Sequence, residues 1–168
     1  VTKTKTVKVK YEIWGGFYAA ADGNFYIVVG YENQNESKTK TVIKVIKYNK
    51  NWKKVKTASI KGNATNVFEG IVIPFRAGSC SMDMKENTLY IHTSRQMFMH
   101  ADGLRHQSNI SFAVDTKTMK AVATEDAYAS HSFNQYAKFD GDDLYLLDHG
   151  DAYPRSILLT KVSNYGTD

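Results

Sequence analysis

The sequence lacks the features that mark several broad classes of protein. Cys80 is the single cysteine among 168 residues, so an internal disulfide cannot form and stability must come from packing. No apolar run approaches the roughly 20 residues that a membrane-spanning helix needs. Apolar residues with helical spacing are almost absent as well, which leaves β-strands as the main regular element.

The remaining composition is that of one globular domain. Hydrophobic residues make up 42%, aromatic residues 12% and charged residues 23% of the chain, which excludes both a disordered and a membrane-embedded protein. A length of 168 residues is enough to bury a core. The chain begins at Val1 with neither a methionine nor a signal peptide, so we expect a mature segment or an excised part of a longer polypeptide.

Positive charge is concentrated in the first third of the chain. Residues 1–61 hold 13 lysines and four acidic residues, a net charge of +9, whereas residues 62–168 have a net charge of −4. Such asymmetry can mark an arm that binds nucleic acid or an anionic cell wall. Here the lysines alternate with apolar residues, as in TVKVK and TVIKVIKY, which is typical of half-exposed strands. We therefore favour solvated strand faces over polyanion binding, and we expect no nucleic-acid partner.

Alternation of apolar and polar residues predicts strands along the whole chain. The first is expected at residues 6–13, and three larger units follow at 14–61, 70–126 and 129–165, the last of them incomplete. Short polar turns separate the strands within each unit. These turns are Asp22-Gly23-Asn24, Asn49-Lys50-Asn51, Lys85-Glu86-Asn87, Asp115-Thr116-Lys117-Thr118 and Asp140-Gly141-Asp142-Asp143.

The order of strands and turns recurs along the chain. A shift of 67 residues superimposes the first unit on the second and places Val45 on Phe112 and Trp52 on Met119. Four-stranded antiparallel units that repeat at about 40 to 60 residues are typical of β-propeller blades. The sequence therefore predicts one all-β domain with two complete blades, a three-stranded third blade, and residues 6–13 as an outer strand that completes a blade.

Three blades cannot close a propeller, because propellers have at least about four. We therefore expect either that two or more chains assemble into one ring or that the chain is a fragment of a larger propeller protein. A homo-oligomer is expected for the isolated chain, since bare blade flanks would expose apolar surface. A compact β-sandwich is the alternative fold.

Several segments also carry a resemblance to a known family. The segments WGGFY, KYNKNW, LYIHTSRQMF with DGLRHQSN, and SHSFNQ followed by DHGDAYPRS are similar to segments of large secreted or surface proteins of Gram-positive gut bacteria that carry propeller-like blades. The resemblance covers nearly the whole chain and implies an extracellular or cell-surface setting. It implies no activity or catalytic residue, because that family is poorly characterised.

The long loops hold most of the chemically versatile side chains. In an antiparallel blade, the loops between second and third strands and those between blades lie at one end, and the tight turns lie at the other. The long loops here are YENQNESKTK, SRQMFMHADGLRHQS and DHGDAYPRS, together with the connections 63–79 and 125–135. Binding residues concentrate in loops on a rigid scaffold, so we expect one functional face that gathers all five histidines. Its candidate binding residues are His100, Asp102, Arg105, His106, His131, Asn134, Gln135 and Tyr153.

Binding of a carbohydrate or protein ligand is the leading hypothesis for this face, and an enzyme site is the second. His149, Asp151 and Arg155 could serve acid–base chemistry on an anionic sugar, as in a hydrolase or lyase. The sequence has no sialidase-like Asp-box, no WD or Kelch signature and no G-x-S-x-G motif, so we favour a module without catalysis. A structural spacer within a surface protein is the third hypothesis.

A metal site receives less support from the sequence. His100 with Asp102 and His149 with Asp151 both read His-x-Asp, a pattern that could supply mixed metal ligands. The two pairs follow their second strands at different distances, 11 and five residues after the strand start, so they share no common geometry. We predict neither a metal nor a cofactor. The aromatic side chain of Tyr153 could stack on a sugar ring or pack its loop onto the blade.

Overall fold

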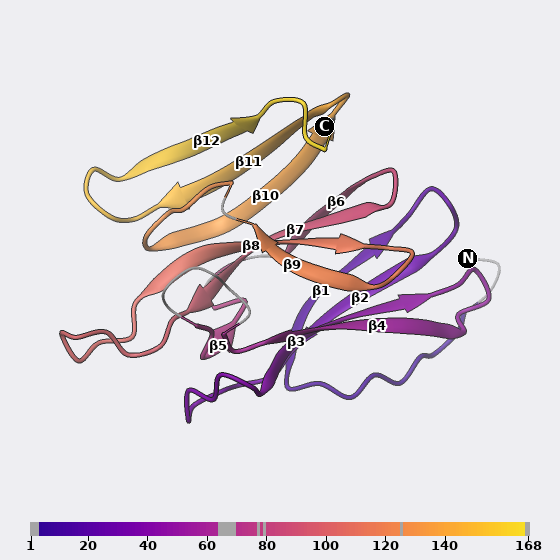
Figure 1. Ribbon diagram of the computed structural model, residues 1–168, viewed down its shortest axis with the longest axis horizontal. Coiled ribbons are helices and arrows are strands. Elements are labelled where there is room, and N and C mark those ends of the chain that lie inside the picture. Colours follow the sequence, from indigo (N-terminus) through magenta and orange to yellow (C-terminus); the bar gives the residue numbers. More distant parts are fainter. Residues whose placement is uncertain (1–3, 64–69, 77, 79, 125, 167–168) are drawn as a thin grey trace.

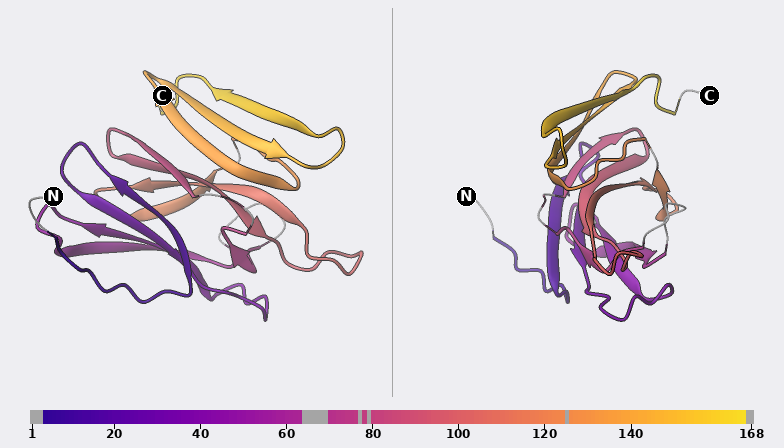
Figure 2. Two further views of the ribbon diagram at one scale, coloured as in Figure 1. Left: turned by 180° about the vertical axis from the view of Figure 1, so that it is seen from behind. Right: turned by 90° about the vertical axis from the view of Figure 1, so that its left-hand side faces the viewer.

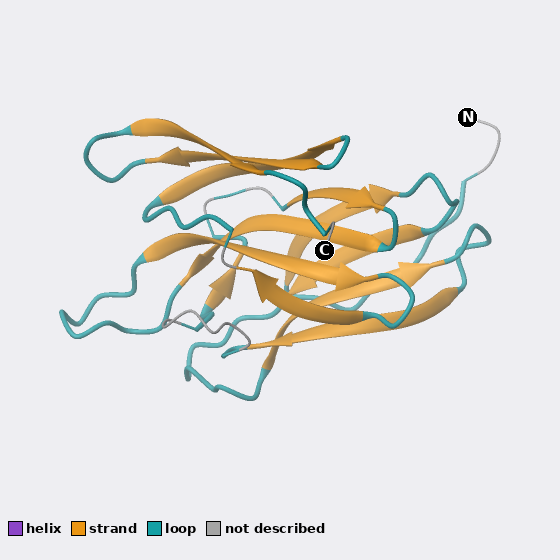
Figure 3. Cartoon of the chain, turned by 45° about the horizontal axis from the view of Figure 1, so that its top comes forward, coloured by secondary structure: helices purple, strands orange, loops and turns teal. Residues whose placement is uncertain are grey.

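The protein is an all-β structure, as the sequence predicts. The computed structural model describes residues 4–63, 70–76, 78, 80–124 and 126–166. Within these residues it contains strands, turns and loops but no helix (Figure 3). Accordingly, the described residues hold no helix of the length and apolarity that crossing a membrane requires.

Twelve strands follow one another along the described chain. The turns predicted at Gly23, Glu86 and Gly141 join the two strands of three hairpins, and both glycines adopt the left-handed backbone that such turns require, with φ of 81° and 59°. The strands are β1 (Ile13–Ala19), β2 (Phe25–Gly30), β3 (Thr41–Tyr48), β4 (Lys54–Lys61), β5 (Ile73–Pro74), β6 (Ser81–Lys85), β7 (Thr88–Gln96), β8 (Gln107–Asp115), β9 (Lys120–Thr124), β10 (Ser132–Asp140), β11 (Asp143–Gly150) and β12 (Ser156–Val162).

The strands form three antiparallel sheets in chain order. Sheet 1 has the order β1-β2-β3-β4, and sheet 3 has the order β10-β11-β12. Sheet 2 runs β6-β7-β8-β9, with the short β5 paired to the far part of the same edge of β7 that β6 occupies. Sheet 2 is strongly curled, like half of a barrel, as the right-hand view of Figure 2 shows.

Sheets 1 and 2 pack face to face around the main apolar core. Val45 of β3 and Phe112 of β8 are both buried in it, with inward-facing side chains of β2, β4 and β7 around them. Each fully buried side chain of this size contributes about 1.5–3 kcal/mol relative to exposure. The half-buried Cys80 packs against the same core. This interface therefore holds the first two sheets together by apolar contact.

Sheet 3 packs against the opposite face of sheet 2. Residues of β7 alternate between the two faces, so Leu89 and Ile91 face sheet 1, whereas Tyr90 is buried in a second cluster with side chains of β10 and β11. The Tyr90 hydroxyl donates a hydrogen bond of 2.7 Å to Asp126 Oδ2. The three sheets thus form a stack in the order 1, 2, 3, in which consecutive sheets pack face to face (Figure 1).

The predicted strand at 6–13 is wrong for nearly all of its length. Residues 4–12 take part in no strand pairing, and regular structure begins only at Ile13. The alternating pattern has another cause: the apolar side chains of Val7 and Val9 pack against the outer face of sheet 1, whereas the residue between them is exposed. Their partners there are Ile27, Val29, Ile46 and Tyr48.

The two ends of the sheets differ in the length of their connections. The hairpin turns lie at one end, called the turn end below. The loops 31–40, 97–106 and 151–155 join β2 to β3, β7 to β8 and β11 to β12 at the opposite end, called the loop end (Figure 1). The predicted arrangement of short turns opposite long loops is confirmed.

Candidate ligand-binding site at the loop end

Three histidines form a row at the loop end. The ring centroids of His100 and His106 are 4.9 Å apart, and those of His106 and His131 are 5.8 Å apart. His149 lies near the same end of β11, whereas His92 lies in the middle of β7 and is fully buried. The prediction of one histidine-rich face is therefore confirmed for four of the five histidines.

Asp102 orients this row. Its Oδ1 accepts a hydrogen bond of 2.9 Å from the Leu104 amide, and its Oδ2 lies 2.7 Å from His106 Nε2. The Leu104 amide first, and His106 second, hold the pKa of Asp102 below its ordinary value. Asp102 thus closes the turn of its own loop and fixes the ring that lies between the other two histidines.

An irregular start of β10 links this row to sheet 3. His131 and Asn134 have φ of 53° and 50°, in the left-handed region that non-glycine residues rarely adopt. The pairing of β10 with β11 is irregular over the same stretch, between Phe133 and Tyr136. The His131 carbonyl accepts a hydrogen bond of 3.0 Å from the Asp151 amide. The strained segment therefore places the histidine row next to the loop after β11.

A hollow of about 320 Å³ lies beside this junction. Its lining combines an aromatic ring, an amide, an imidazole and a carboxylate, supplied by Phe133, Asn134, His149 and Asp151. The rings of Phe133 and His149 lie 6.3 Å apart and are inclined by 57°. These residues come from β10, from the end of β11 and from the following loop, so the hollow belongs entirely to sheet 3.

The loop after β11 presents its last side chains to solvent. Arg155 Nε lies 2.7 Å from Asp151 Oδ1, and the two side chains are 77% and 43% exposed. The ion-pair partner of Arg155 thus lies four residues away in its own loop. Tyr153 is 99% exposed and stands at the tip of this loop. Arg155 and Tyr153 therefore belong to the loop that supplies Asp151 to the hollow, and both side chains are largely exposed.

Arg105, a predicted binding residue, links two loops at the loop end. Its Nε donates a hydrogen bond of 2.9 Å to Glu36 Oε1, and its two terminal nitrogens donate to the Gln34 side-chain and main-chain oxygens. These contacts tie the loop after β7 to the loop after β2. Arg105 thus connects sheets 1 and 2 at the loop end.

Gln135 is also buried and not available to a ligand. It donates a hydrogen bond of 2.6 Å to Ser132 Oγ, which itself donates to Asp148 Oδ1. Asp148 also accepts from Asn109 Nδ2 at 3.0 Å and faces His92 Nε2 at 3.0 Å. All five side chains are at most 2% exposed, so they form a buried polar network between sheets 2 and 3.

This network contains a Ser-His-Asp series that sequence reasoning missed. His92 Nδ1 lies 2.7 Å from Ser111 Oγ, opposite the contact of Nε2 with Asp148. A carboxylate only accepts hydrogen bonds, so His92 Nε2 donates to Asp148, and Nδ1 forms a hydrogen bond with the Ser111 hydroxyl on the other side of the ring. Ser111 is 1% exposed, so no substrate can reach its hydroxyl. The series is therefore a structural element and not a nucleophilic site.

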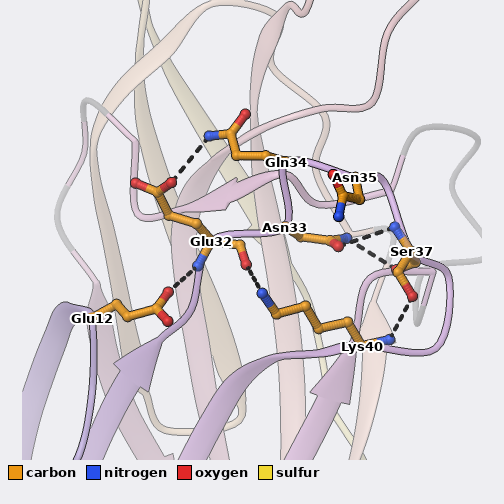
Figure 4. A pocket seen from close by; sticks show the side chains of 7 residues that line it. All are labelled: Glu12, Glu32, Asn33, Gln34, Asn35, Ser37 and Lys40. Carbon is orange, nitrogen blue, oxygen red and sulfur yellow. Dashed lines mark hydrogen bonds between the residues drawn. The ribbon is translucent and has the colours of Figure 1, made fainter.

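A second hollow of about 270 Å³, lined by polar residues, lies at the loop end of sheet 1 (Figure 4). Glu12 Oε2 accepts a hydrogen bond of 2.8 Å from the Glu32 amide, and Lys40 Nζ donates to the Glu32 carbonyl. The buried Asn33 closes the loop through Ser37. Sequence reasoning identified this loop but not Glu12, which precedes β1 and reaches the loop only through the fold. The polar groups of this hollow mostly bond one another.

The geometry gives no metal centre in the described part of the chain. No group of three or more His, Cys, Asp or Glu side chains among these residues is placed to hold a metal ion. Within the predicted connections between blades, residues 64–69, 77, 79 and 125 lie outside the described residues.

Neither a family model, nor a curated protein, nor a solved structure matches this chain.

Proposed function

We propose that this chain is an extracellular binding module that takes a carbohydrate in the hollow between β10 and the loop after β11. The observation that carries the proposal is the composition of the hollow. Phe133 offers an apolar ring face, and Asn134, His149 and Asp151 offer donors and acceptors around it. A sugar ring has the matching character, with apolar C–H faces and hydroxyl groups at its edge, and such mixed linings are typical of small-ligand sites.

The exposed residues next to the hollow extend this surface. Tyr153 is almost fully exposed, and an aromatic ring held in water by its loop is suited to stacking on a second sugar unit. The Arg155 guanidinium is charged and only locally paired, so it adds an anion-binding group for a carboxylated sugar. The surface thus fits an oligosaccharide better than a single sugar.

The fold that supports this site is, in our proposal, part of a β-propeller. Three antiparallel sheets stacked face to face in chain order support this interpretation. Trp52 and Met119, which lie 67 residues apart, also share an unusual left-handed backbone, with φ of 60° and 56°. The resemblance to bacterial surface proteins supports an extracellular setting. Loops at one end of stacked blades are a common place for ligands.

Binding can be tested on a glycan array followed by calorimetric titration of the best glycan. We expect binding without product release, and at least a tenfold loss of affinity in His149→Ala and in Phe133→Leu. Asp142→Asn is the matched control, because Asp142 is an exposed residue at the turn end that pairs with Lys85. Its affinity should equal that of the unchanged chain. If no glycan binds, or if His149→Ala binds as tightly as the control, the proposal is wrong.

The same experiment separates binding from catalysis. His149 and Asp151 line one hollow, so an acid–base function on a bound sugar is the second candidate. Chromatography of the incubated glycan measures it. Release of a shortened product that is lost in Asp151→Asn would replace the binding proposal with an enzyme.

A further inference from the structure

The stack of sheets is unfinished at sheet 3. In the described residues, no strand pairs with the outer edge of β12, whereas sheets 1 and 2 each contain a fourth strand at this position. The outer face of sheet 3 is also bare. Leu147 of β11 pairs with Tyr136 of β10 on one side and with Leu159 of β12 on the other. The side chains of Tyr136 and Leu159 are 59% and 68% exposed. The neighbouring Ile157 is 72% exposed. Among the described residues, this side of sheet 3 therefore has neither a fourth strand nor a covering sheet.

The chain follows one rule in passing from sheet to sheet. We call the first strand of each sheet order (β1, β6, β10) innermost and the last strand of sheets 1 and 2 (β4, β9) outermost. The outermost strand of a sheet comes directly before the innermost strand of the next sheet. Thus β4 precedes β6, with only the short β5 between them, and β9 precedes β10. Residues 4–12 directly precede β1, which is the innermost strand of sheet 1. By this rule they occupy the position of an outermost strand, although they belong to none of the three sheets.

Residues 3–10 also have the sequence of an outermost strand. They read KTKTVKVK, and β4, the outermost strand of sheet 1, reads KVKTASIK. Lysine falls at the first, third and last positions of both, and threonine at the fourth. Frequent lysines are typical of a strand at the solvent-facing edge of a sheet. The pattern fits strand pairing, although residues 4–12 have no strand partner within one chain.

We propose that a second copy of this chain completes sheet 3. Residues 4–12 of the second copy pair with the outer edge of β12, and its sheet 1 covers the outer face of sheet 3. The contact is head-to-tail, and two copies joined in this way at both ends place six sheets in one closed ring, within the usual range for propellers. The hollow lined by Phe133 and His149 lies at the loop end of this same outer face, because His149 pairs with Ile157, so the contact runs alongside it. The inference does not depend on a carbohydrate being bound there.

The charges and the present contacts of the segment fit this exchange. Residues 1–61 have a net charge of +9, whereas residues 132–162, which form sheet 3, hold five acidic and three basic residues. Within one chain, the segment is held by two half-buried valines and a few hydrogen bonds, such as that from the Tyr31 hydroxyl to the Lys10 carbonyl at 2.7 Å. Its departure bares the apolar outer face of sheet 1, which is the face that would then pack on sheet 3.

Light scattering of the full 168-residue chain, at several concentrations and salt strengths, tests association. We expect a species of twice the 19.0 kDa chain mass, weakened by added salt. Leu159→Lys should shift it to monomer. Val122→Lys is the matched control, because Val122 is 65% exposed on β9, the outermost strand of sheet 2, and this variant should remain a dimer. A monomer at all concentrations, or a dimer that Leu159→Lys leaves intact, would overturn the proposal.

Disulfide trapping tests the direction of the contact. Two single variants, Val7→Cys and Leu159→Cys, are mixed and oxidised. A disulfide between the two different variants, at higher yield than either variant forms with itself, is the expected result. Predominant Leu159→Cys homodimers would show a face-to-face contact and overturn the head-to-tail arrangement. Circular dichroism of each variant confirms that a lost dimer does not reflect unfolding.

Discussion

The interface between sheets 1 and 2 and the interface between sheets 2 and 3 are both formed by stacked antiparallel sheets, but the first is mainly apolar and the second mainly polar. Sheets 1 and 2 meet through a continuous apolar core, in which Val45 and Phe112 are typical members. Sheets 2 and 3 share only a small apolar cluster around Tyr90 and rely on buried hydrogen bonds. Asp148 accepts several of these, and Asp83 of β6 accepts another from the Phe139 amide of β10 at 2.8 Å.

This difference explains why the candidate site lies where it does. Apolar contacts are non-directional and tolerate small displacements, whereas a buried polar network is satisfied in only one arrangement. Asp148 is anchored in the network, and His149 follows it directly in β11. The polar interface therefore fixes the position of the hollow relative to sheet 2 more strictly than an apolar interface would.

The largest effect is expected from truncation within the apolar interface. Phe112→Ala removes a fully buried ring between sheets 1 and 2, and we expect it to lower the free energy of unfolding by about 3–5 kcal/mol. Urea denaturation measures the change. A loss below about 1 kcal/mol would show that the two sheets do not depend on this core.

Truncation within the polar interface should come next. Asp148→Ala leaves His92, Asn109 and Ser132 without their shared acceptor, and we expect a loss of about 3 kcal/mol in the free energy of unfolding. Asp151→Ala, an exposed carboxylate three residues later, is the control and should change it by less than about 0.5 kcal/mol. Equal values for the two variants would contradict the assigned role of the network.

Low pH should weaken the polar interface between sheets 2 and 3 more than the apolar interface between sheets 1 and 2. Burial alone would raise the pKa of Asp148, but hydrogen bonds from His92, Ser132 and Asn109 hold it below its ordinary value. The pKa of Asp83 is likewise lowered, by the Phe139 amide, Lys138 and other donors, against the effect of burial. Such carboxylates stabilise the fold above their unfolded pKa of about 4, and this stabilisation is lost as the pH falls through the lower folded pKa.

Urea titrations from pH 7 to pH 2.5 measure this dependence. The free energy of unfolding should fall below about pH 4 in the unchanged chain and in Phe112→Ala with a similar slope. Asp148→Asn should flatten part of the curve, because the residue no longer titrates. If Asp148→Asn retains the full slope, the acid sensitivity has another origin.

The smallest effect is expected at the exposed pair beside the hollow. Arg155→Gln removes an ion pair between two solvent-exposed side chains, and such pairs contribute at most about 1 kcal/mol, often less than 0.5 kcal/mol. The free energy of unfolding should therefore hardly change, while the affinity for an anionic sugar should fall. A large loss of stability would show that the loop holds the sheets together.

The local pattern of the sequence was enough to predict the hairpins. Asp-Gly at residues 140–141 and Asp22-Gly23 define turns through glycines that adopt positive φ, and the period of two defines their strands. The same pattern misled at residues 4–12, because an alternating segment can place its apolar side on a sheet face without pairing. Apolar–polar alternation alone does not show whether a sheet edge is free to pair with the segment.

The candidate site was predictable only in part. The histidines of the long loops follow from the connectivity, since loops of one type gather at one end of antiparallel sheets. The partnership of His92 with Asp148 does not, because the two residues are 56 positions apart and meet only through the stacking of sheets 2 and 3. Arg105 and Gln135 look like surface ligands in the sequence, but the loop of sheet 1 and the buried network satisfy them.

The position of Cys80 has a practical consequence for labelling. Although the residue is only half-buried, desolvation of the thiol against the core raises its pKa to about 12. Since the thiolate is the reactive form, this raised pKa slows the reaction of the sulfur with maleimides at neutral pH. A fluorophore or spin label should therefore react first with an introduced surface cysteine while the native one stays in place. Distances between labelled chains then become measurable in the otherwise unchanged protein.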